Sequence, residues 1–275
     1  MVRLFSLLAG LLAALFVIGA AEIGMAQEDI PIAADAAPIA RQIDAVEARQ
    51  GVASDGTHVY ALDNNRIGKY RIDTGEKVAS WEGDKALFPH MNSCTIVGSE
   101  LACAASNYPA VPQTSAVEFF DTATLRHVRT VSLGLGPGSL TAMEYRGSKW
   151  WAVFANYDGK GGDPTRDHRH TLLVQMNENF QQEQAWTFPP DVLAKFAPKS
   201  CSGASWGMNG VLYVSGHDRP ELYALKLPQA GSVLELVKTI PIRTRGQAID
   251  WDPVVPNRLW SISRMNEKLV ASIVQ

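Results

Sequence analysis

The sequence lacks a strong excess of charge of either sign. Its 25 Lys and Arg residues face 28 Asp and Glu residues, which gives a formal net charge of −3. No basic cluster stands out, and binding to nucleic-acid phosphates requires concentrated positive charge. Beyond residue 26 there is also no apolar run long enough to cross a bilayer. The composition therefore argues against nucleic acid as a partner and against a membrane-spanning mature chain.

Several common catalytic motifs are also missing. There is no Gly-x-Ser-x-Gly elbow of a serine hydrolase. The glycine clusters at 134–138 and 159–162 lack the strand-to-helix context of a phosphate-binding loop, which argues against nucleotide binding. No zinc-ligand spacing is formed by the scattered histidines His90, His168, His170 and His217.

The N-terminus has the layout of a secretory signal peptide. Arg3 precedes a 17-residue apolar run over residues 4–20, and small residues surround a cleavage position after Ala26. An uncleaved anchor is the alternative, but this run is at the short limit for a spanning helix. We expect residues 1–26 to be removed, and residues 27–275 to form one periplasmic or secreted domain.

Three cysteines are present, Cys94, Cys103 and Cys201. If Gly98 and Ser99 form a two-residue hairpin turn, Cys94 directly faces Cys103, at a separation that suits a disulfide. An exported chain meets an oxidising compartment, which favours this bridge, although small cysteines also pack well when buried. Cys201 is then unpaired, and we expect an inert buried thiol rather than a reactive one.

A short β-rich unit occurs five times. Each copy has a polar or small start, a β-rich run, a tight turn and a second run, usually followed by two more. Repetition of a sheet-forming unit every few tens of residues is typical of a radial array. The copies start at Gln50, Asn92, Ser139, Ser202 and Gln247.

The repeats predict an all-β, five-bladed β-propeller. The fifth copy ends after its third strand, and residues 39–48 precede the first copy without a unit of their own. This N-terminal segment can supply the missing outer strand and close the ring. Six blades is the alternative, because the third interval is long. We interpret its extra length as two loop insertions, at 157–170 and at 189–199, the second with a short helical turn.

In a propeller the starts of the innermost strands converge on a central channel. Converging polar groups predict a binding site there, although such groups can also cap backbone ends. The Asn-Tyr pairs that begin at Asn107 and Asn156 have a similar alternative, since Asn also makes local bonds to turn backbone. The predicted ligand-binding residues are Gln50, Asn92, Asn107, Ser139, Asn156, Ser202, Arg245 and Gln247.

Three residues are candidates for acid–base chemistry. Asp218 follows His217, and a carboxylate can orient an imidazole and raise its basicity. His90 stands at the start of the second copy. No metal ligands are assigned and no cofactor is expected. Calcium is the alternative, because Asn and carboxylate oxygens around a channel would suit it. Asp158, Asp163 and Asp167 share a Gly-rich loop without the spacing of a known calcium loop, and we interpret it as a solvated loop or lid.

Parts of the sequence resemble known propeller families. Gln50-Gly51, Asp55-Gly56 and residues 69–77 are similar to the first blade of glutamine cyclotransferase-type five-bladed propellers. Asn107-Tyr108-Pro109, Gly216-His217-Asp218 and Gly246-Gln247-Ala248 resemble exported bacterial propellers of a cycloisomerase-like group. The resemblance implies a propeller that acts on a small molecule, without naming a substrate.

Two functions follow from the sequence. The first is binding of a small polar molecule in the channel, with acid–base catalysis of a lyase, isomerase or cyclase type. The second is a non-catalytic propeller that binds a ligand or a protein partner.

Overall fold

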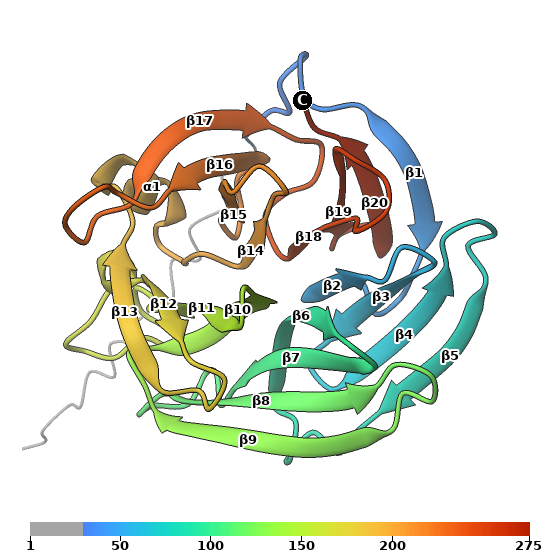
Figure 1. Cartoon of the computed structure of the whole chain (residues 1–275), viewed down its shortest axis with the longest axis horizontal. Helices are drawn as coiled ribbons and strands as arrows, with labels where there is room; N and C mark the ends of the chain where they lie inside the picture. The colour runs from blue at the N-terminus through green and yellow to red at the C-terminus, as the bar shows by residue number, and fades with distance from the viewer. Residues whose placement is uncertain (1–29) are drawn as a thin grey trace, which may run out of the picture.

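The computed structural model describes residues 30–275, so the predicted signal peptide lies outside the described residues. Five four-stranded antiparallel sheets stand around a common axis (Figure 1). The chain is therefore a five-bladed β-propeller, as the repeats predicted, and the six-bladed alternative is wrong. The long third interval holds the two predicted insertions instead of a sixth sheet. Within the described range, no helix is long and apolar enough to span a bilayer.

The strands run outward from the axis in chain order in the first four blades. Blade 1 has β2 (Gly51–Ser54), β3 (His58–Asp63), β4 (Arg66–Arg71) and β5 (Lys77–Glu82). Blade 2 has β6 (His90–Val97), β7 (Glu100–Ser106), β8 (Thr114–Asp121) and β9 (His127–Leu135). Blade 3 has β10 (Ser139–Arg146), β11 (Lys149–Ala155), β12 (Leu172–Met176) and β13 (Gln182–Thr187). Blade 4 has β14 (Gly203–Trp206), β15 (Leu212–Ser215), β16 (Glu221–Lys226) and β17 (Glu235–Pro241).

Blade 5 is built from both ends of the chain. Its inner strands are β18 (Ile249–Trp251), β19 (Arg258–Ser263) and β20 (Lys268–Ile273), and its outer strand is β1 (Ile39–Asp44). β1 pairs antiparallel with β20, with Asp44 opposite Lys268. Figure 1 shows β1 beside β20 at the rim of the ring. The prediction that residues 39–48 close the ring is confirmed.

The core lies between the blades. Five clusters of buried apolar side chains are found among residues 30–275, and each joins two neighbouring sheets. Between blades 1 and 2, for example, Tyr60 of β3 packs with Leu101 of β7 and Phe120 of β8, all fully buried. Alternation along each strand supplies both faces of a blade, because successive side chains point to opposite sides. Apolar contact between blades thus fixes their rotation about the axis.

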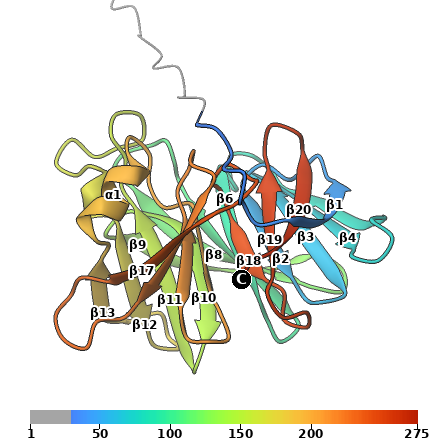
Figure 2. The ribbon, with the colours of Figure 1, turned by 90° about the horizontal axis from the view of Figure 1, so that it is seen from above.

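The innermost strands run from one face of the ring to the other. In Figure 2, α1 (Pro190–Phe196) lies on the upper face, and β10 runs away from that face. The short helix is the helical turn predicted in the insertion at 189–199. The insertion at 157–170 carries a short 3₁₀ helix, η1 (His168–His170). We call the channel end at the starts of the innermost strands the α1-side mouth.

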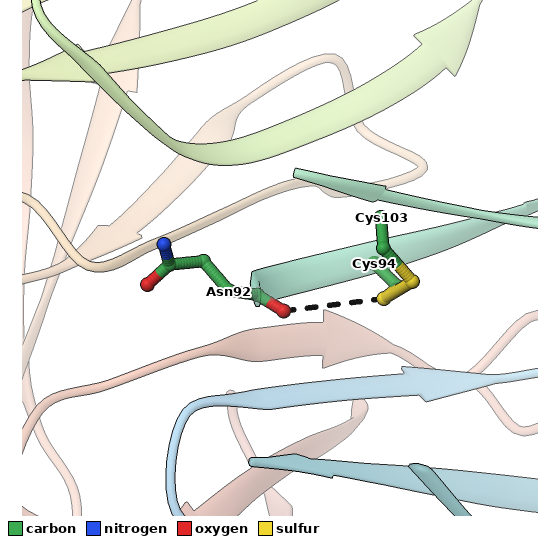
Figure 3. Close-up of a disulfide and its surroundings, with 3 residues drawn as sticks. All are labelled: Asn92, Cys94 and Cys103. Atoms are coloured by element: carbon green, nitrogen blue, oxygen red, sulfur yellow. Dashed lines mark hydrogen bonds between the residues drawn. A yellow bond between two sulfur atoms is a disulfide. The ribbon is translucent and has the colours of Figure 1, made fainter. Parts of the chain in front are cut away.

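The register of blade 2 brings two cysteines together. The turn at Gly98 and Ser99 sets Val97 opposite Glu100 and Cys94 opposite Cys103. These two cysteines form a disulfide across β6 and β7 (Figure 3). Cys201 is fully buried, and burial raises the pKa of its thiol to about 12. The predicted bridge and the predicted inert thiol are both present in the structure.

Thiol titration tests this arrangement. Native protein should expose no thiol to a colorimetric reagent, and protein unfolded without reductant should expose one. The Cys201→Ala variant should expose none in either state, whereas three thiols in the unfolded wild type would contradict the bridge. Replacing both Cys94 and Cys103 by alanine should lower the free energy of unfolding by about 2–3 kcal/mol, because a covalent link restricts the unfolded chain.

Candidate functional site

The starts of the innermost strands and the ends of the second strands meet at the α1-side mouth. His90 at the start of β6 pairs with Ser106 at the end of β7, and Ser139 at the start of β10 pairs with Ala155. Residues far apart in sequence are thus brought together at one end of the channel, as the repeat pattern predicted.

A pocket of about 680 Å³ opens at this mouth, beside blades 4, 5 and 1. Four of the residues that line it are arginines. Two carboxylates lie close to this group: Glu267 pairs with Arg49 at 2.8 Å, and Asp218 contacts His217. The pocket is lined by Ile32, Arg49, His217, Arg243, Arg245, Gln247, Ser263, Arg264, Met265 and Asn266.

Asp218 and Arg264 hold His217 from its two sides. The Nδ1 atom of His217 lies 2.5 Å from Oδ1 of Asp218, and a guanidinium nitrogen of Arg264 lies 3.2 Å from Nε2. Guanidinium groups only donate hydrogen bonds, so Nε2 accepts and the ring proton is on Nδ1. His217 is therefore neutral in this arrangement, and its free electron pair is already engaged by Arg264.

Asp218 stays ionised beside this ring. Burial alone would raise the pKa of Asp218, but the hydrogen bond with His217 and the nearby cations Lys199 and Arg264 outweigh burial and lower that pKa. The carboxylate orients the imidazole, as the adjacent His-Asp pair predicted.

His90 occupies the same mouth in a different state. Its Nδ1 lies 2.7 Å from Oδ1 of Asn64, and Nε2 of Gln50 donates to the same oxygen at 3.4 Å. Because this amide oxygen accepts, Nδ1 of His90 carries the proton and Nε2 is an acceptor. Among residues 30–275, no side chain hydrogen-bonds to Nε2.

The electrostatic surroundings keep His90 neutral. Burial, and then the positive charge of Arg264, lower the pKa of His90 to about 4. Tyr108 packs on the His90 ring with centroids 4.9 Å apart. Burial raises the pKa of the Tyr108 hydroxyl, and the positive charge of Arg264 offsets part of this rise. Arg264 therefore lies within electrostatic reach of His90, Tyr108 and His217.

Gln247 faces the pocket from a strained backbone position. Its φ is +67°, a conformation that costs energy for any residue except glycine, and such strain is common at functional sites. The residue is only 3% exposed, and its backbone N–H donates to the Gly216 carbonyl at 3.0 Å. Its side-chain amide lines the pocket and makes no hydrogen bond within the described part of the chain.

Two of the predicted ligand-binding residues hold loops instead. Asn107 donates to the Pro112 carbonyl and accepts from the Thr114 N–H, both at 2.9 Å. Asn156 donates to the carbonyls of Pro137 and His170 at 2.9 and 3.1 Å. The bonds of Asn107 are the local turn role that was the alternative for the Asn-Tyr pairs, whereas Asn156 joins two segments 19 and 14 residues away in the sequence.

Three more predicted residues are tied to neighbouring blades. Ser139 donates to the Ser106 hydroxyl at 2.8 Å, and the amide of Asn92 donates to the Leu140 carbonyl at 3.4 Å. The carbonyl of Ser202 accepts from the Ser93 hydroxyl at 3.4 Å. In Figure 3 the Asn92 amide extends away from the disulfide. Of the eight predicted binding residues, Arg245 and Gln247 line the pocket, whereas Gln50 donates to Asn64, the partner of His90.

The long loop brings three metal-type ligands together. One atom each from Asp158, Asp167 and His168 lie within 4.8 Å of one another. His168 already contacts both oxygens of Asp158, at 2.8 and 2.9 Å, and Arg169 pairs with Asp167 at 2.5 Å. Asp163 instead accepts from Thr165. Calcium prefers oxygen ligands, so only Asp158 and Asp167 of this cluster suit the calcium alternative, and each is held by a partner within the loop.

The sequence interpretation missed two carboxyl groups farther along the channel. Glu144 of β10 accepts the Trp206 N–H at 2.7 Å, and Asp250 of β18 accepts the Ser54 N–H at 2.8 Å. The Ser205 hydroxyl lies 3.3 Å from Asp250 and also hydrogen-bonds Glu144. The two carboxyls thus meet at one hydroxyl group.

Burial favours the protonated form of both acids. It raises the pKa of Glu144 to about 7 and, together with the charge of Glu144, raises that of Asp250 well above its usual 3.8. A sequence signal for this pair does exist: Glu144 and Asp250 occupy similar positions in the innermost strands of blades 3 and 5.

Comparison with known proteins supports the fold alone. No protein-family model and no curated protein sequence matches the chain. The PQQ-bound aldose sugar dehydrogenase of Streptomyces coelicolor is similar over 86% of this chain and 81% of its own, with 13% identity and a TM-score of 0.51. Hydrazine synthase of Kuenenia stuttgartiensis covers 82% and 83% of the two chains, with 11% identity and a TM-score of 0.48. At these identities the shared feature is the propeller.

The pKa of His90 predicts a loss of stability in acid. Unfolded histidine binds a proton near pH 6.5, whereas folded His90 does so near pH 4, so the unfolded state takes up the proton first as the pH falls. His90→Asn keeps a donor to Asn64 and cannot titrate. This variant should lose roughly 1–3 kcal/mol less stability than wild type between pH 6.5 and 4 in urea unfolding. The exposed control His170→Asn should keep the wild-type acid profile; equal slopes for all three proteins would contradict the assignment.

Glu144 predicts the opposite slope. Its pKa is raised from 4.5 to about 7, so the folded state keeps a proton that the unfolded state has lost. The stability from this proton is complete below pH 4.5 and is lost as the pH rises through 7. Glu144→Gln keeps an acceptor for Trp206 without a charge, and relative to wild type it should gain roughly 1–3 kcal/mol between pH 4.5 and 8. Glu183→Gln, which removes a surface ion pair with Lys149, should show no such gain.

Proposed function

We propose that this chain binds a small anionic molecule at the α1-side mouth of its channel. The observation that carries the proposal is a local surplus of positive charge around a 680 Å³ pocket, in a chain whose formal net charge is −3. Pockets of this size, with a few placed polar groups, are typical of small-molecule sites. The sequence predicts a polar site in the channel, and these arginines give the proposed site a preference for anions.

The four arginines of the pocket come from different segments and can bind one anion together. Arg264 comes from the end of blade 5, Arg243 and Arg245 from the segment before β18, and Arg49 from the segment after β1. Guanidinium groups recognise carboxylate and phosphate oxygens through paired N–H donors. Glu267 pairs with Arg49, and Asp218 lies against His217, so these two carboxylates balance part of the charge of the four arginines. The remaining positive potential supports attraction of an anion to this face.

We also propose that the protein works outside the cytoplasm, in the periplasm or as a secreted chain. The signal-peptide layout of residues 1–26 supports export, and so does the disulfide between Cys94 and Cys103, since such bonds persist in oxidising compartments.

The second candidate is an enzyme that uses acid–base chemistry on the bound anion. His90 supports it, because its Nε2 is an acceptor without a described partner and lies near the cations of the pocket. The resemblance to cycloisomerase-like and glutamine cyclotransferase-type propellers favours a lyase, isomerase or cyclase reaction. The non-catalytic alternative, a module that holds a ligand or a protein, needs the pocket but not a base.

Calorimetric titration at low salt tests anion binding. Succinate, citrate and inorganic phosphate are the probes, and glycerol is the neutral comparison. Arg264→Gln should weaken binding of the best anion about 10- to 100-fold, because a hydrogen bond to a charged group contributes about 1.5–3 kcal/mol.

Arg126→Gln is the matched control, because it changes an exposed arginine in the turn between β8 and β9. It should leave the affinity unchanged. Glycerol binding as tight as that of the anions, or equal losses in both variants, would rule out recognition of charge at this mouth.

A further inference from the structure

The cationic pocket at the α1-side mouth also has apolar lining. Two of its residues, Ile32 and Met265, are large apolar side chains that are 41% and 85% exposed. Exposed apolar side chains that occur singly are common on protein surfaces. These two come from opposite ends of the chain and line the same pocket as four arginines. Apolar surface beside a few converging charged groups indicates a ligand that has both characters.

The segment that carries Ile32 is held against the ring. Ala36 and Ala37, shortly after it, are buried, and the Ala37 N–H donates to the Pro241 carbonyl at 2.9 Å. Figure 2 shows this part of the chain, ahead of β1, on the upper face. Ile32 therefore lines the pocket from an anchored segment.

Met265 lies in the turn between β19 and β20, next to Arg264. Its unbranched thioether chain can adapt to ligands of different shape, and methionine is frequent at apolar binding surfaces for this reason. At 85% exposure, most of this side chain is in contact with water. An aliphatic group that covers it removes apolar surface from water, which favours binding.

Arg243 supplies a guanidinium group for the charged end of the ligand. It is exposed, and within the described chain it forms no hydrogen bond or ion pair. Arg49, by contrast, pairs with Glu267. A guanidinium carries five N–H donors in a planar fork that fits a carboxylate. A carboxylate can therefore bind Arg243 without breaking an existing ion pair.

We propose that the ligand is an alkyl carboxylate, whose carboxylate binds Arg243 and the neighbouring arginines and whose aliphatic chain packs on Ile32 and Met265. This inference rests on the proposed function, because it assumes that an anion binds at the same mouth. It adds a requirement for an apolar chain, which inorganic phosphate lacks.

A series of linear acids, each with one negative charge, separates recognition of the chain from recognition of the charge. Acetate, butyrate and hexanoate differ only in the number of methylene groups, and hexanol has the chain without the charge. Full burial of one methylene group contributes roughly a fourfold factor in affinity. In calorimetric titration at pH 7 and low salt, hexanoate should therefore bind about tenfold more tightly than butyrate, since it has two more methylene groups to bury. Butyrate should bind more tightly than acetate, and hexanol should show no measurable binding.

Replacing Ile32 and Met265 tests where the chain of the ligand lies. Both side chains are exposed, so Ile32→Asn together with Met265→Gln should leave the fold intact. This double variant should reduce the preference for hexanoate over butyrate from about tenfold to about twofold, because the apolar contact is lost. Arg243→Gln should instead weaken both acids by a similar factor.

Met208→Gln is the matched control for the double variant. Met208 is 77% exposed in the turn between β14 and β15, at the opposite end of an innermost strand from the α1-side mouth. It should keep the wild-type preference for hexanoate. The wild-type series of acids gives the answer even if a variant folds poorly.

The outcomes separate this inference from the proposed function. Equal affinities for acetate, butyrate and hexanoate, or a chain-length preference that survives in the double variant, overturn the alkyl carboxylate and leave anion binding intact. Binding of succinate, citrate or phosphate without binding of the linear acids has the same meaning. Failure of all these anions to bind, or hexanol binding as tightly as hexanoate, overturns both proposals.

Discussion

Pairing of β1 with β20 is the constraint on which the rest of the molecule depends. It joins residues 39–44 to residues 268–273, and the ion pair between Asp44 and Lys268 lies at one end of the ladder. Without this pairing, β20 would present an unpaired edge of backbone donors and acceptors. The closure also brings Arg49, from the segment after β1, to the pocket that Arg264 lines from the turn after β19. The ring and its cationic mouth are thus consequences of the same hydrogen-bond ladder.

Much of the architecture could be predicted from the sequence, because its cause is local. The hairpin at Gly98 and Ser99 fixes the register that sets Cys94 opposite Cys103. The turn residues and alternating apolar positions give four strands in each unit, and the incomplete fifth unit requires the early segment. Each of these predictions needs only nearest-neighbour geometry and a complete set of backbone hydrogen bonds.

The site was harder to predict, because its properties depend on pairs from different blades. The sequence identifies His90, His217, Arg245 and Gln247, but not that Asn64 fixes the proton of His90 or that Arg264 engages Nε2 of His217. It also does not show that the side-chain amides of Asn107 and Asn156 donate to backbone carbonyls, those of Pro112 and Pro137. Glu144 and Asp250 were missed because only the ring brings the third and fifth inner strands to one hydroxyl, that of Ser205.

The fifth blade, which is built from both ends of the chain, also governs the order in which the protein can fold. The side chains of Asp44 and Lys268 are partners across 224 positions of the sequence. Blades 1 to 4 contain only neighbouring segments and can form as each emerges during synthesis, whereas β1 must wait for the last strand. The pocket at the α1-side mouth, which Arg49 and Arg264 both line, is consequently completed last, when the two ends of the chain have met.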